Sequence, residues 1–133
     1  MISFVVIPAR GVHLPFVTDS WAACDRSAQD GWRSRRIGIS QAKGVIREII
    51  AGHGVTTLVA ADTEDDEAIL GWACYEPGTV HYIYLREKFG VDGWRGVPIL
   101  RALLAPFAGM QSGEYTHRPS REIHIPAGWR YAG

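Results

Sequence analysis

The stretch Val80–Leu104, VHYIYLREKFGVDGWRGVPILRALL, decides the fold. Its first part, Val80–Leu85, is mostly aromatic and β-branched, which predicts a strand. Pro98 suits the first turn of a helix, because the amide hydrogen that proline lacks would have no partner there. Apolar residues then recur at helical spacing as far as Phe107. Between strand and helix, Arg86–Gly96 is rich in glycine. Such a loop directs backbone N–H groups and the helix dipole at one point, which predicts a site for a phosphate or pyrophosphate.

Composition indicates a single folded domain, residues 1–133. Of the 133 residues 47% are apolar, and 14 basic residues balance 14 acidic ones. A chain of this length buries roughly two-thirds of its unfolded surface. The zero net charge disfavours a nucleic-acid reader. No apolar run approaches the roughly 20 residues that a membrane-spanning helix needs. The first residues lack the basic segment of a signal peptide, and two cysteines demand no disulfide, so we expect a reduced, cytoplasmic chain.

The rest of the chain predicts an α/β fold with a mixed, mostly antiparallel central sheet flanked by helices. Three consecutive strands with short turns should form an antiparallel meander, and the helices should cover it. Residues 118–133 read as an extended tail, with short extended pieces at Ile123–Ile125 and Trp129–Tyr131. The other expected elements are a strand at Ser3–Ile7, a helix from about Pro15 to Asp30-Gly31, a helix capped by Ser40 with a buried stripe of Ala42, Val45, Ile46, Ile49 and Ile50, strands at Val55–Ala61, Ile69–Tyr75 and Glu114–His117, a solvated acidic hairpin end at Asp62–Glu67, and a type II turn at Glu76–Thr79.

With this order of elements and a central strand, loop and helix, the chain resembles the GCN5-related N-acetyltransferase (GNAT) family. Leu85 fits the apolar residue that ends the fourth strand of that family, Phe89 the aromatic residue before its motif, and Gly93 the central glycine of the motif. The resemblance implies that acetyl-CoA binds along Leu85–Gly96 and that an amine attacks the thioester directly. It also implies the cofactor-binding residues, which are Leu85, Arg86, Gly90, Gly93, Arg95 and Gly96.

Two positions depart from the family motif. Gly90 stands where arginine or glutamine is expected, and Arg95 stands where a small residue is expected. The Arg95 side chain would either fill the diphosphate position or supply the charge that Gly90 lacks. The chain also lacks a full final helix and strand, and its ending resembles short family members encoded by tailed phages. The sequence therefore leaves two functions open: an acetyl-CoA-dependent N-acetyltransferase, or a non-catalytic virion or assembly component that retains the fold.

If the chain is an enzyme, the resemblance places the amine beside the fourth and fifth strands. Tyr84 and Glu76 are then the catalytic candidates, because each lies near this strand and could assist removal of a proton. Sheet packing for Tyr84 and a solvated turn for Glu76 are the structural alternatives. Strand alternation puts His81, Ile83 and Leu85 on one face, where His81 would be a packed or half-exposed strand residue. The histidines and cysteines show no metal-ligand spacing, so the sequence predicts no metal site.

Three tryptophans fall in predicted loops or in the tail. Trp32, Trp94 and Trp129 are each followed by an arginine, a pairing typical of protein–protein anchors, so phage structural proteins or a second copy of the chain are the expected partners. Packing beneath the loops is the alternative. The basic run Arg33–Arg36 could hold the 3′-phosphate of CoA, an acidic protein surface or a nucleic-acid backbone, and the neutral net charge disfavours the last of these.

Overall fold

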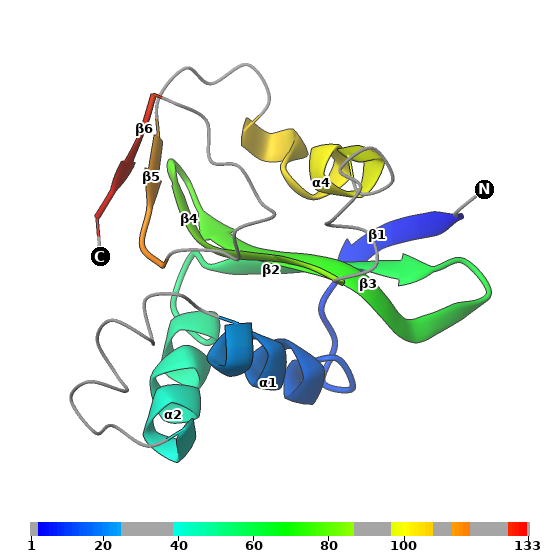
Figure 1. Ribbon diagram of the computed structural model, residues 1–133, viewed down its shortest axis with the longest axis horizontal. Coiled ribbons are helices and arrows are strands. Elements are labelled where there is room, and N and C mark those ends of the chain that lie inside the picture. Colours follow the sequence, from blue (N-terminus) through cyan, green and yellow to red (C-terminus); the bar gives the residue numbers. More distant parts are fainter. Residues whose placement is uncertain (1–2, 25–38, 87–96, 108–112, 118–127, 133) are drawn as a thin grey trace.

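The computed structural model describes residues 3–24, 39–86, 97–107, 113–117 and 128–132 of the chain. They form a mixed sheet in the order β1-β2-β3-β4-β5-β6, with helices on both faces (Figure 1). The strands are β1 (Phe4–Pro8), β2 (Thr56–Asp62), β3 (Asp65–Glu76), β4 (Thr79–Leu85), β5 (Gly113–Tyr115) and β6 (Trp129–Tyr131). The helices are α1 (Leu14–Cys24), α2 (Ile39–Ile50), α4 (Val97–Leu103) and the short 3-10 helix η2 (Ala105–Phe107).

The expected antiparallel meander is confirmed. Strands β1 to β4 pair antiparallel in sequence order, while β5 pairs parallel to β4 and β6 parallel to β5. The fold is therefore mixed α/β with a mostly antiparallel sheet, as the sequence predicts. The β3–β4 turn has Gly78 at a φ of 77°, a left-handed conformation that glycine adopts without strain and that the third residue of a type II turn requires.

The two faces of the sheet bury different clusters. Helices α1 and α2 cover one face, where Val17, Trp21 and Ile46 pack on side chains of β2, β3 and β4. Helix α4 covers the other face, where Ile99 and Leu103 are fully buried against the sheet. Both faces carry aromatic residues. On the α1 face the rings of Trp21, Trp72 and Tyr82 contact one another.

Several local expectations need correction. Helix α2 already begins at Ile39, so Ser40 lies inside the helix and does not precede it. Within the expected buried stripe, Ala42 and Ile46 are buried but Val45 is 45% exposed, because the helix contacts the sheet along a narrower face. Strand β3 begins at Asp65, so part of the acidic segment extends the hairpin. The tail contributes a true edge strand, β6, whereas the expected end of the first helix at Asp30-Gly31 and the piece at Ile123–Ile125 lie outside the described residues.

Candidate functional site

The candidate site lies where β5 leaves β4. Among the described strands, β5 pairs with β4 only at Thr79 and Val80, while β4 continues to Leu85. The amide of Arg86 donates to the carbonyl of Leu70 on β3 at 2.9 Å. This bond shows which residues of β4 direct their backbone groups toward β3. In an antiparallel pair successive residues turn their backbone groups to opposite sides, so Ile83 and Leu85 direct N–H and C=O away from β3. Among the residues that the structure describes, no strand pairs with this half of β4 on the β5 side, where Ile83 and Leu85 present backbone donors and acceptors.

A β-bulge in β4 sits beside that open stretch. Cys74 of β3 pairs with Tyr82, but the next residue, Tyr75, pairs with Val80, so His81 is the extra residue. The bulge resets the alternation, and Val80 joins Ile83 in the cluster beneath α4. The expectation that His81 shares this face with Ile83 is therefore wrong. A bulge re-aims a side chain, and here the imidazole of His81 reaches across to the residue that follows β5.

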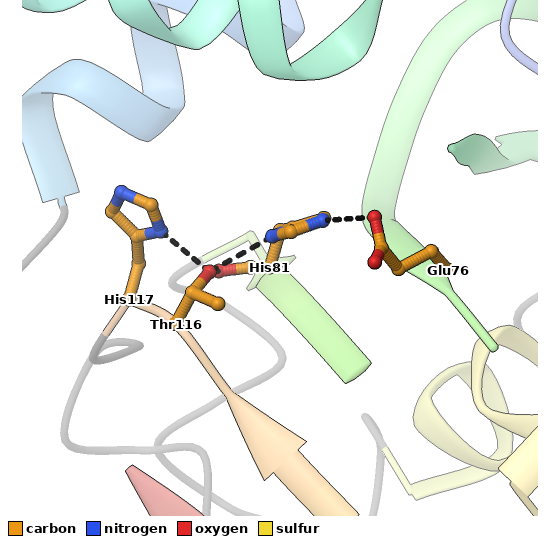
Figure 2. Close-up of polar contacts among 4 residues, drawn as sticks. All are labelled: Glu76, His81, Thr116 and His117. Atoms are coloured by element: carbon orange, nitrogen blue, oxygen red, sulfur yellow. Dashed lines mark hydrogen bonds and ion pairs between the residues drawn. The ribbon is translucent and has the colours of Figure 1, made fainter. Parts of the chain in front are cut away.

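Four polar side chains form one continuous chain of hydrogen bonds at the bulge (Figure 2). Nε2 of His81 lies 3.1 Å from Oε2 of Glu76, and Nδ1 of His81 lies 2.9 Å from Oγ1 of Thr116. The same Oγ1 lies 2.8 Å from Nδ1 of His117. The His81 side chain is 13% exposed and that of Glu76 is 42% exposed. The series of hydrogen bonds thus begins at the solvent-accessible carboxylate of Glu76 and continues to side chains that are partly buried.

The environment keeps His117 neutral. Burial, together with the nearby His81, lowers its pKa from 6.5 to about 4, although a hydrogen bond with the backbone of His81 partly opposes the shift. Its ring meets the ring of Trp21 edge to face, with centroids 5.2 Å apart. Trp21 is itself fully buried on α1. At neutral pH His117 is therefore an uncharged imidazole. It lies just beyond β5 and contacts α1 on the face of the sheet that α1 and α2 cover.

The structure separates the two predicted catalytic residues. Glu76 joins the polar chain at one end of β4, whereas Tyr84 lies near the other end, roughly 15 Å away at about 3.3 Å per residue. The Tyr84 ring packs against Trp72 and Phe16, with centroid distances of 6.2 and 5.7 Å. The packing alternative therefore describes the ring of Tyr84, and its catalytic role stays a prediction. Glu76 is paired with a histidine, so it is more than a solvated turn residue.

Two of the predicted cofactor-binding residues, Leu85 and Arg86, are described, and the side chains of both contact other parts of the fold. Leu85 is 7% exposed and belongs to the core beneath α4, so only its backbone faces the open edge. Arg86 donates from Nε to the carbonyl of Ile69 at 2.5 Å and stacks over the Phe16 ring at 5.6 Å. The remaining candidates lie outside the described residues, and their roles stay predictions. These are Phe89, Gly90, Gly93, Arg95, Gly96, Trp32, Trp94 and Arg33–Arg36.

Sequence reasoning missed Thr116 and His117. It placed them in a final strand and gave them no role, although a Thr-His pair at the end of a strand was the available signal. Their partner could not be identified, because the bulge that turns His81 toward them leaves no mark in the pattern of the strand. In the described part of the chain no cluster of three or more histidine, cysteine, aspartate or glutamate side chains could hold a metal ion.

A hollow of about 640 Å³ lies between α1 and α2. Its wall is mainly apolar, with Leu14, Pro15 and Ile50, and it carries one acidic and one basic residue, Asp19 and Arg47. Asp19 is also bonded to Lys43 at 2.9 Å. The hollow lies on the side of the sheet that α1 and α2 cover, which is also the side where the His117 ring contacts Trp21.

None of the helices in the described ranges has the length and hydropathy that a membrane crossing requires.

Comparisons with known proteins give distant similarities only. Searches of protein-family models and of curated proteins found no match. A mutant of the spermidine/spermine N-acetyltransferase SpeG from Vibrio cholerae is similar over 81% of this chain and 64% of that chain, at 11% identity and a TM-score of 0.47. This chain thus spans less than two-thirds of the length of that enzyme.

Two further solved structures are similar at the same level. A transcriptional regulator from Bacillus halodurans C-125 matches over 98% of this chain and 81% of its own, at 12% identity and a TM-score of 0.48. A ribosomal-protein-alanine N-acetyltransferase from Brucella melitensis biovar Abortus 2308 matches over 81% and 71%, at 17% identity and a TM-score of 0.42. Similarities this weak carry no argument about activity, and they give no support to a phage origin.

Proposed function

We propose that the protein is an N-acyltransferase that moves an acetyl group from acetyl-CoA to a small amine. One observation carries the proposal: the open half of β4 lies directly beside a bulge that holds an imidazole paired with a carboxylate. The pantetheine arm of acetyl-CoA contains amide groups, which can pair with the outward N–H and C=O groups of Ile83 and Leu85 as an added strand would. The order of the elements along the chain is the one that the sequence resemblance to the GNAT family implies.

The bulge then determines where chemistry takes place. An arm that pairs along Ile83 and Leu85 brings its thioester toward the bulge at His81. The amine nitrogen attacks the thioester carbonyl, a C–N bond forms and the C–S bond breaks. The CoA thiolate takes the proton that the nitrogen loses on forming the amide, so CoA leaves as a thiol. The ammonium proton must be removed, and the pair of His81 and Glu76 is the base next to the reaction centre. The carboxylate orients the imidazole through the contact at Nε2.

The diphosphate of CoA would extend beyond Leu85 into the Arg86–Gly96 loop. The motif glycine Gly93 and the departures at Gly90 and Arg95 belong to this loop, and whether they hold the diphosphate stays a prediction. The proposal needs a backbone approach here that a large side chain would prevent. Gly93→Glu should therefore abolish binding while the melting temperature stays within the range of a surface variant.

Calorimetric titration with acetyl-CoA tests the proposal, followed by an assay for CoA thiol release with a panel of primary amines. We expect binding, and in Glu76→Gln we expect unchanged binding with turnover lower by roughly tenfold or more. Glu67→Gln is the matched control, because Glu67 is an exposed residue of the β2–β3 hairpin away from the bulge. No heat and no thermal shift at millimolar acetyl-CoA would reject the enzyme and leave the non-catalytic alternative.

A further inference from the structure

We propose that the hollow between α1 and α2 binds an amphiphilic carboxylate, that is, an acid with a small apolar body such as a medium-chain fatty acid. Its volume of about 640 Å³ lies in the ordinary range for small-molecule sites. The described residues that line it include none of the four side chains at the bulge, and the hollow lies beside the two helices on one face of the sheet (Figure 1). The inference therefore goes beyond the proposed function and does not depend on it.

The wall of the hollow supplies apolar contact for the body of such a ligand. Leu14 and Pro15 begin α1, while Ile50 ends α2 and Ala51 follows it. These four side chains have no group that can form a hydrogen bond. A ligand that displaces water from them therefore gains the free energy of apolar burial, and a ligand that is polar throughout does not.

The charges at the hollow favour an anionic head group. Asp19 is already bonded to Lys43 at 2.9 Å, so the charges of these two residues offset each other. Arg47 lies one turn further along α2 and also lines the hollow, and no acidic side chain in the described residues pairs with it. A guanidinium presents its N–H donors in a planar fork that matches a carboxylate. The unbalanced charge at the hollow is therefore positive.

Thr18 provides a second group for the head of the ligand. It lines the hollow, the residue is only 3% exposed, and no hydrogen bond joins its hydroxyl to another described residue. Ser20, two positions further along α1, instead donates to the carbonyl of Phe16 at 2.7 Å. A hydroxyl that is not used within the fold can donate to a ligand. A carboxylate in the hollow would accept from this hydroxyl and from Arg47.

The helix ends at the hollow do not decide the sign of the charge on the ligand. α1 begins at Leu14 and α2 ends at Ile50, so the positive end of one backbone dipole and the negative end of another both lie at the hollow. Their effects on a charged head group oppose each other. The preference for an anion thus rests on Arg47, and removal of its charge is the decisive perturbation.

Backbone amide NMR on the intact protein tests the site, with octanoate, octylamine and 1-octanol as the probes. The three probes share one alkyl chain and differ in the charge of the head group. We expect octanoate to shift the signals of residues at the hollow, such as Thr18 and Ile50, and to bind roughly tenfold more tightly than octylamine. Absence of shifts at millimolar octanoate would overturn the inference. So would shifts confined to β4, or tighter binding of octylamine than of octanoate.

Substitutions at the hollow then test the contacts of the head group. Arg47→Gln should weaken octanoate binding roughly tenfold and leave the binding of 1-octanol unchanged. Thr18→Val keeps the shape of the side chain, removes the hydroxyl and should weaken octanoate binding severalfold. Arg101→Gln is the matched control, because Arg101 is exposed on α4, on the other face of the sheet. Equal affinity of Arg47→Gln and wild type for octanoate would overturn the inference, whether or not acetyl-CoA binds.

Discussion

The depressed pKa of His117 makes the stability of the protein dependent on pH. The perturbation is a decrease of pH from 6.5 to about 4 in the wild type and in His117→Asn. Asparagine places an amide nitrogen near the position of Nδ1, so it can still donate to Thr116, but it does not titrate. The comparison of the two proteins therefore isolates the proton on residue 117 from the titration of carboxylates elsewhere.

The sign and the size follow from linkage. Below pH 6.5 the unfolded chain binds a proton on His117, while the folded chain binds it only near pH 4. The unfolded state thus holds more protons in this window, and the free energy of unfolding falls as the pH falls. Each pKa unit corresponds to about 1.4 kcal/mol, so a shift from 6.5 to about 4 has an upper limit of about 3 kcal/mol. Because the ring is only partly buried, we expect a loss of roughly 1 to 3 kcal/mol relative to the variant.

Urea unfolding followed by tryptophan fluorescence measures the effect at several pH values across this window. As the pH decreases, the free energy of unfolding should fall more steeply for the wild type than for His117→Asn. The difference between the two proteins should accumulate below pH 6.5. The free energy of unfolding should depend on urea concentration with the same slope in both proteins, because unfolding exposes the same surface area in each. Parallel curves across the whole window would refute the reasoning, since they would mean that His117 titrates alike in the folded and unfolded chains.

Three further substitutions test other parts of the fold. Gly44→Ala should raise the free energy of unfolding by about 0.5–1 kcal/mol, because Gly44 lies within α2 and a Cβ there meets no atom within 4 Å; a loss of stability on urea unfolding would contradict this. Ser20→Ala should lower it by roughly 1–3 kcal/mol, since the buried indole N–H of Trp72 donates to Ser20 at 2.9 Å; an unchanged unfolding midpoint would count against it. Burial raises the pKa of Cys74 from 9.0 to about 11, so the folded chain holds the proton longer and stability should decline as the pH rises through this window, an effect absent in Cys74→Ala; equal declines in both proteins would disprove it.

Much of the sheet could be predicted because its determinants are local. The alternation of residues along β4 and the Pro77-Gly78 pair specify a strand and a tight turn without reference to the rest of the chain. The meander follows because short turns leave consecutive strands no other partners. The predicted boundaries of the elements were wrong where contacts between elements determine them. The hairpin of β2 and β3 extends into an acidic segment that its composition alone identifies as a turn.

The site could be predicted only in part, because it depends on long-range pairing. Glu76 was a candidate from its position beside the strand. Its partner His81 was assigned to the wrong face, since a bulge is decided by register between two strands and not by the residues of one. Thr116 and His117 lie more than thirty positions from His81, and the parallel pairing of β4 with β5 brings them together. A single sequence contains no local sign of such a pairing.

The tail has a structural role within the fold, of the kind that the packing alternative for Trp129 describes. Trp129 of β6 packs edge to face on Phe107, with centroids 5.4 Å apart, and its ring covers Gly113 of β5. A Cβ at Gly113 would lie 3.0 Å from that ring, so the close approach of the two strands depends on a glycine at this point. The indole predicted as an anchor for a partner thus holds β5 within the same chain. Because Thr116 directly follows β5, this packing also fixes the hydroxyl between the two imidazoles. The tail therefore belongs to the site through the strand that it supports, although it contributes none of the four hydrogen-bonded side chains at the bulge.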